Sequence, residues 1–109
     1  MKLYVQGVAR FVTDLELRNV ETSEGEKKVV SARIAVNEGK EKSSFFPCEM
    51  WQGTAEFASK FFEKGSQVQF KGYLTNRKHV HLRGQENEFT TTDVVIVIDE
   101  FDFVGKKKE

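Results

Sequence analysis

Apolar and polar residues alternate along most of this chain, and this period of two indicates β-strands that bury one face. In the first such segment, 2–12, Leu3, Val5 and Ala9 share one parity with Gly7. A glycine inside a strand is typical of a bulge or of a close approach by another backbone. We therefore expect one of these two features at Gly7.

The same alternation predicts further strands, separated by polar runs that are typical of loops. The strands are predicted over 29–37, 45–51, 66–77 and 89–103, and the loops over 21–26, 38–44 and 79–88. The last strand is long and rich in β-branched residues. We expect it to kink near Asp99 and Glu100, where two acids interrupt the apolar run.

Residues 54–64 form the one segment with helical periodicity. The apolar residues at helical spacing are Ala55, Ala58, Phe61 and Phe62. Gly65 follows and is a typical residue for ending a helix. The element order is then three strands, one helix and two strands. This order is typical of an all-β OB-fold, a five-stranded Greek-key barrel with one α-helix between strands three and four.

Length and composition fit one compact domain, which we place at 1–104, followed by a short basic tail at 105–109. The 17 basic and 17 acidic residues give a net charge of zero, so a nucleic-acid site would need local segregation of charge. Cys48 is the single cysteine, which excludes an intrachain disulfide and a cysteine-based zinc site. It is expected to be a small buried group. We expect no metal and no cofactor.

No signal peptide is visible, and the longest aliphatic run, 94–98, is far too short to cross a membrane. We therefore expect a cytoplasmic protein without membrane contact. The chain carries no phosphate-binding loop and no nucleophile elbow. The acids of the last strand have mixed parity, so they do not indicate a catalytic cluster. The sequence favours a protein that is not an enzyme.

The strand 45–51 carries the most informative pattern. One face holds Phe45 and Trp51 together with a proline and a glutamate, whereas Phe46, Cys48 and Met50 lie on the opposite face and are expected in the core. Two aromatics on a half-exposed strand make a platform on which unpaired bases can stack. They would equally well cover a subunit interface or the rim of a core, and the strand alone leaves both alternatives open.

Taken together, several short pieces give a more specific signal through their order and spacing. They are Val12–Arg18, Arg33–Asn37, Ala55–Ala58, Lys64–Val68, Gly72–Lys78 and Thr91–Val95. On these pieces the chain resembles the bacterial and phage-type single-stranded DNA-binding protein family, from about Leu3 to Phe103. The resemblance implies an OB-fold that binds single-stranded DNA without catalysis, in replication, recombination or repair. It also implies a homo-oligomer, with a tetramer favoured over a dimer.

The resemblance places Phe45 and Trp51 on two stacking positions of the family. A third stacking position falls on His79, and a fourth falls near Lys40, which is no aromatic. Phosphates would need cations on outward faces and in loops. The further candidates for nucleic-acid contact are Arg33, Lys71, Tyr73, Arg77, Lys78, His79, Lys40, Lys42 and Arg83.

Many family members carry an acidic tail that recruits replication and repair proteins, whereas this chain ends in Lys106-Lys107-Lys108-Glu109. We therefore expect a tailless form. Two family aromatics are missing and the net charge is zero, which keeps an alternative open. In that alternative the chain is an OB-fold protein-interaction module of the primosome type, with weak or no DNA binding. RNA also stays open as a ligand, because stacking platforms accept both nucleic acids.

Overall fold

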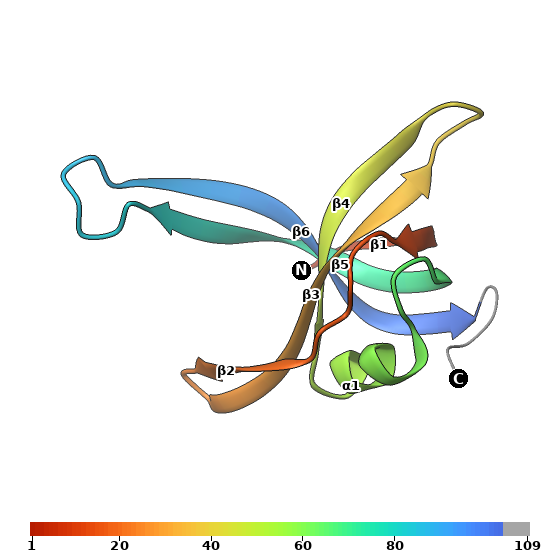
Figure 1. Ribbon diagram of the computed structural model, residues 1–109, viewed down its shortest axis with the longest axis horizontal. Helices are drawn as coiled ribbons and strands as arrows, with labels where there is room; N and C mark the ends of the chain where they lie inside the picture. Colours follow the sequence, from red (N-terminus) through yellow and green to blue (C-terminus); the bar gives the residue numbers. More distant parts are fainter. Residues whose placement is uncertain (104–109) are drawn as a thin grey trace.

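A computed structural model describes residues 1–103 (Figure 1). The elements are β1 (Leu3–Phe11), β2 (Arg18–Thr22), β3 (Gly25–Asn37), β4 (Ser43–Trp51), α1 (Gln52–Phe61), β5 (Gln67–His81) and β6 (Phe89–Phe103). The basic tail predicted at 105–109 lies outside the described residues. No helix within 1–103 is long and apolar enough to span a bilayer.

The strands form one sheet whose pairing closes on itself. Their order is β1-β5-β6-β4-β3-β2, and β1 also pairs with β3 through Arg10↔Ala35 and Phe11↔Ile34. Five strands therefore make a ring, with α1 between β4 and β5 in the chain, and this is the predicted OB-fold. The addition is β2, which pairs with the beginning of β3 and is joined to it by a turn inside the loop predicted at 21–26.

The core lies inside the ring and follows the predicted alternation. Val30, Ile34 and Met50 are fully buried, as is Phe11 of β1. Cys48 is buried as expected, and burial raises the pKa of its thiol to about 12 because an apolar surrounding disfavours the thiolate. The order of the strands and the alternation of their side chains thus determine which face of each strand lies outside the core and can contact a ligand.

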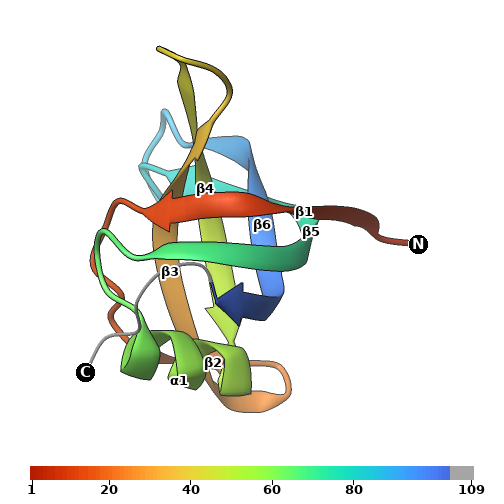
Figure 2. The ribbon, with the colours of Figure 1, turned by 90° about the vertical axis from the view of Figure 1, so that its right-hand side faces the viewer.

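Helix α1 covers one end of the ring (Figure 2). Its buried face consists of Ala55 and Ala58, and Phe62 follows in extended conformation and is also buried. The helix ends at Phe61, before the Lys64 that was predicted. Gly65 is therefore not its stop signal: at φ +96° it turns the chain, and its N–H donates to the Phe11 carbonyl oxygen at 2.8 Å.

The irregularity predicted at Gly7 is found at another glycine. Gly7 pairs with Phe70 in an unbroken register. The shift lies between Lys71 and Gly72 of β5, whose partners Glu100 and Ile98 leave Asp99 as an extra residue in β6, where the kink was predicted. A side chain at Gly72 would overlap the backbone of Val97. The close backbone approach therefore requires glycine here.

Beyond the ring, β5 and β6 continue together as a projecting two-stranded hairpin (Figure 1). We call residues 77–93 the arm. The sequence predicted that this strand would end at Arg77, because residues 79–88 were interpreted as a largely polar loop around Gly84. In the structure β5 continues to His81, and the residues from 81 to 94 are exposed. Backbone pairing, rather than burial of one face, maintains the arm.

Gly72→Ala is expected to destabilise the fold, because its methyl group would displace the Val97 backbone. We expect a loss of about 1–3 kcal/mol or more in the free energy of unfolding, measured by denaturant titration. The matched control is Gly7→Ala, whose Cβ would meet only the Phe70 ring at 3.9 Å. The control should change stability by less than about 1 kcal/mol. Equal losses in both variants would contradict the close approach at Gly72.

Candidate nucleic-acid interface

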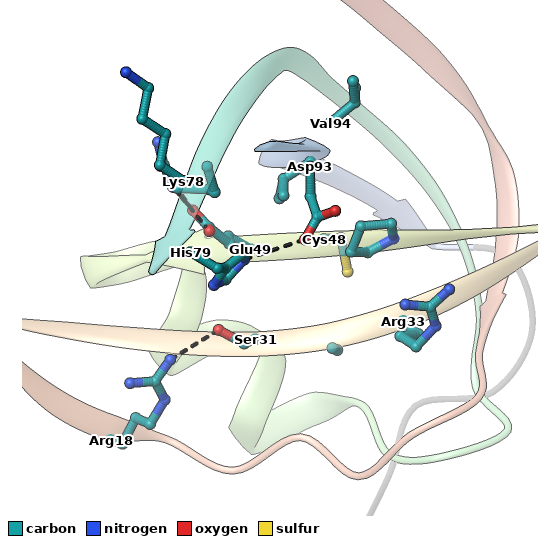
Figure 3. A pocket seen from close by; sticks show the side chains of 13 residues that line it. Arg18, Ser31, Arg33, Cys48, Glu49, Lys78, His79, Asp93 and Val94 are labelled. Atoms are coloured by element: carbon teal, nitrogen blue, oxygen red, sulfur yellow. Dashed lines mark hydrogen bonds and ion pairs between the residues drawn. The ribbon is translucent and has the colours of Figure 1, made fainter. Parts of the chain in front are cut away.

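A groove of about 480 Å³ lies on the outer face of the sheet (Figure 3). Residues of β3, β4, β5 and β6 line it, together with Arg18 of β2. Four of the predicted contacts meet in this groove: Arg33, Arg77, Lys78 and His79. Val95, which is buried, also lines it and adds an apolar surface between the charges.

Glu49 organises the middle of the groove. Its carboxylate accepts a bidentate set of hydrogen bonds from Arg77: Nε lies 3.1 Å from Oε1 and 2.9 Å from Oε2, and Nη2 lies 2.8 Å from Oε1. The side chain of Glu49 is only 13% exposed, against 38% for Arg77. The hydrogen bond to Glu49 raises the pKa of Arg77. Much of the donor capacity of Arg77 is therefore already used.

This ion pair joins two strands that are not neighbours. Glu49 is on β4 and Arg77 is on β5, and β6 lies between these strands in the sheet. Two strand spacings amount to about 9.6 Å, a separation that a long arginine side chain can bridge. The pair thus crosses the outer face of β6.

Trp51 is hydrogen bonded to the same carboxylate. It is the last residue of β4, and its Nε1–H donates to Oε1 of Glu49 at 3.0 Å. Directly after it the chain turns into α1 with Gln52 at φ +52°, and the Gln52 side-chain oxygen accepts the Lys28 backbone N–H at 3.1 Å. Trp51 is half-buried. Its indole is consequently oriented before any ligand arrives.

Phe45 is the more open of the two predicted stacking residues. It is 56% exposed and lies opposite Ala35 of β3. By strand alternation it shares the outer face with Trp51, whereas Phe46 belongs to the core parity and is 38% exposed. An aromatic ring left so open has little role in the core. The predicted pattern is confirmed for Phe45, Cys48 and Met50 and is wrong for Phe46, which was expected in the core and is exposed near the outer end of the strand.

The cations of the groove differ in how strongly they are engaged. Arg33 is exposed, and its guanidinium has no ion pair among the residues that the structure describes. His79 Nε2 lies 3.2 Å from Oδ2 of Asp93, but both side chains are more than half exposed, so this pair contributes little to stability. Lys78, which directly precedes His79 in the sequence, also lines the groove and is exposed.

Arg18 lines the groove although it was not among the predicted contacts. Its Nη2 donates to the Ser31 hydroxyl at 3.0 Å (Figure 3). The sequence held a signal, because Arg18 ends the first piece that carries the family resemblance. The pairing of β2 with β3, which brings Arg18 beside Ser31, was not visible in the alternation.

Besides Phe45 and Trp51, which lie beside the groove, five more predicted contacts lie outside it. Lys71 and Tyr73 are on the part of β5 that pairs with β1, and the Lys2 ammonium lies 4.2 Å from the centre of the Tyr73 ring. The others belong to the connections between strands: Lys40, Lys42 and Arg83. Of these, Lys42 is engaged with Glu38 at 3.4 Å. One face of the Tyr73 ring is thus already occupied by a cation.

Comparison with known proteins shows the family to which this chain belongs. Residues 4–104 match the sequence profile of the Single-strand binding protein family. The chain belongs to this family.

Two relatives show how far the similarity reaches. A single-stranded DNA-binding protein of Onion yellows phytoplasma (strain OY-M) is 32% identical over 93 residues, which are 85% of this chain and 86% of that protein. A single-stranded DNA-binding protein of Malacoplasma penetrans (strain HF-2) is 34% identical over 61 residues, 52% of this chain and 32% of that protein. Proteins of the single-strand binding family are DNA-binding proteins and not enzymes.

Single-stranded DNA is a polyanion, so the negative charge of Glu49 should repel its phosphates. Glu49→Gln keeps an acceptor for Trp51 but removes the charge that engages Arg77. We expect the Kd for poly-dT to fall roughly five-fold, about 1 kcal/mol, at low salt. The slope of log K against log salt should steepen by about 0.7, the value for one more phosphate on a single strand.

The matched control for this experiment is Glu100→Gln, which makes the same charge change on β6 outside the groove. It should leave both the affinity and the salt slope close to those of the unmodified protein. An unchanged slope in Glu49→Gln would show that Glu49 does not compete with phosphate for Arg77.

Proposed function

We propose that this protein binds single-stranded DNA without sequence specificity by stacking bases on Phe45 and Trp51. The observation that carries the proposal is the position of these two aromatics on the outer face of β4, beside a groove that holds Arg33, Lys78 and His79. Stacking accepts every base because each has a π-face, and cations along the groove attract the backbone.

The cations that could contact phosphates differ in whether a carboxylate already pairs with them. Arg33, which lies opposite Pro47 in the register of β3 with β4, is free to meet a phosphate. Arg77 must exchange Glu49 for a phosphate or remain as a support for Trp51. Lys40, Lys42 and Arg83 lie in strand connections, from which they would reach a strand that passes over the barrel. Lys71 and Tyr73 would contact DNA only if it continued toward β1.

The biological setting follows from the ligand. A protein that coats unpaired DNA protects it and opens weak secondary structure by mass action on the unpaired state. Replication, recombination and repair all produce such DNA, so we place the protein in these processes and in the cytoplasm of a bacterial cell or an infected host. We propose a homo-oligomer, with a tetramer favoured over a dimer, and RNA as a second ligand for the same stacking surface.

A second candidate function rests on the acids in the groove. Glu49 and Asp93 lie among its cations and balance part of their charge. A groove with mixed charge and an apolar patch would also suit a protein partner, as expected for an OB-fold interaction module in a primosome-type assembly. In that case the affinity for single-stranded DNA would be negligible.

The test is a titration with poly-dT, followed by the emission of Trp51, which is the only tryptophan. We expect saturable quenching at low salt, weaker binding at high salt and no quenching by duplex DNA of equal length. Absence of both quenching and binding would favour the protein-interaction module.

Phe45→Ala is expected to weaken poly-dT binding by about 1–3 kcal/mol, the value of one stacked base. Trp51→Ala should have an effect of the same size. Affinity is measured by anisotropy of a labelled oligonucleotide, because the second variant lacks the fluorophore. Phe46→Ala, adjacent in sequence but on the core parity, is the matched control: it should lower stability while leaving Kd within about two-fold. Wild-type affinity in Phe45→Ala would show that β4 is not the platform.

A further inference from the structure

The arm carries an aromatic pair that the site described above does not use. The rings of His81 and Phe89 are stacked, with centroids 4.6 Å apart and an angle of 12° between their planes. The two residues face each other in the register of β5 and β6. His81 Nε2 is also hydrogen bonded to the Thr91 hydroxyl oxygen at 2.8 Å. These two contacts hold the imidazole in a fixed orientation.

This pair contributes nothing to the core of the barrel. Phe89 is 49% exposed, and His81 is exposed as well. The core cluster contains no residue of the arm. A large aromatic ring on a projecting hairpin gains little by burial there, so its open ring surface is available to a flat ligand.

The pair continues the path of the groove. Strand alternation puts Arg77, His79 and His81 on one face of β5, and the first two of these line the groove. His81 therefore lies two residues, about 6.8 Å, farther along the arm than His79. At His79 the ring is small and is paired with Asp93. The larger aromatic surface on this face comes only at His81 and Phe89.

We propose that the His81–Phe89 pair is a stacking position for an unpaired nucleobase, additional to Phe45 and Trp51 and reached by a strand that leaves the groove along the arm. This inference rests on the proposed function. Arg83, exposed two residues beyond His81, supplies a positive charge for the phosphate next to that base. The site takes any base, because the ring faces recognise a π-surface and no hydrogen-bonding edge.

The first experiment moves the fluorophore to the arm. In the double variant Trp51→Phe, Phe89→Trp, the single tryptophan stands at the proposed position, while a stacking ring remains on β4. Saturating poly-dT should quench its emission, and an abasic polymer of the same length should bind by charge without quenching it. Binding of poly-dT with unchanged emission would overturn the arm position.

The second experiment measures Kd for oligo-dT of increasing length with Phe89→Leu, which keeps an apolar side chain but removes the ring face, and with Phe89→Tyr, which keeps the ring. For oligonucleotides long enough to leave the groove, Phe89→Leu should raise Kd about five-fold or more, whereas Phe89→Tyr should match the unmodified protein. For the shortest oligonucleotides that bind, all three should agree.

The outcomes separate the two proposals. If the unmodified protein binds poly-dT and Phe89→Leu binds long oligonucleotides equally well, the pair only stabilises the hairpin, and the arm position is wrong while the function stands. That purely structural role would lower the melting temperature of Phe89→Leu and leave Kd unchanged. If the folded unmodified protein does not bind poly-dT at all, both proposals are overturned.

Discussion

The close contact between β5 and β6 at Gly72 is the constraint on which the rest of the structure depends. There the backbone of Val97 occupies the space that any side chain at Gly72 would need. The extra residue Asp99 on β6 offsets the register at the same point. The bulge lies within the closed ring, because residues on both sides of it pair with β1, and the same strand pair leaves the ring as the arm only from Arg77 and Asp93 onward. Where the pair leaves the ring, Arg77 lies beside Glu49 and His79 lies beside Asp93.

The alternation of residues was enough to predict most of the core faces, the presence of the helix and the outward position of Phe45 and Trp51, although Phe46 was wrongly expected in the core. This worked because burial on one side leaves a period of two in the sequence. The loop at 21–26 was predicted, but the strand before it, β2, and the outer half of β5 were missed for the same reason. Both strands are largely exposed, so no alternation separates their faces, and their structure depends on pairing with a neighbouring backbone. Such pairing leaves almost no trace in one sequence.

The centre of the groove was beyond prediction for a different reason. Glu49 and Arg77 are 28 residues apart and meet across the intervening strand β6. Pairing rules relate residues on adjacent strands, and this contact follows none of them. Glycine positions were equally ambiguous: Gly7 and Gly72 both interrupt apolar strands, and only the neighbouring backbone decides which one requires the missing side chain. Arg77 was correctly noted as outward-facing, but its partner was not foreseen.

A single oxygen atom, Oε1 of Glu49, accepts hydrogen bonds from both the Trp51 indole and the Arg77 guanidinium. The hydrogen-bond free energies of Trp51 and Arg77 are therefore coupled. When the Arg77 guanidinium moves away from Oε1, the charge density on this oxygen and the mobility of the Glu49 carboxylate both change. The hydrogen bond from the Trp51 indole to the same oxygen then changes in strength and geometry. Substitutions at these two positions should be non-additive in a thermodynamic cycle, unlike those at distant sites. Ring contacts and charge contacts on this surface thus form one cooperative unit.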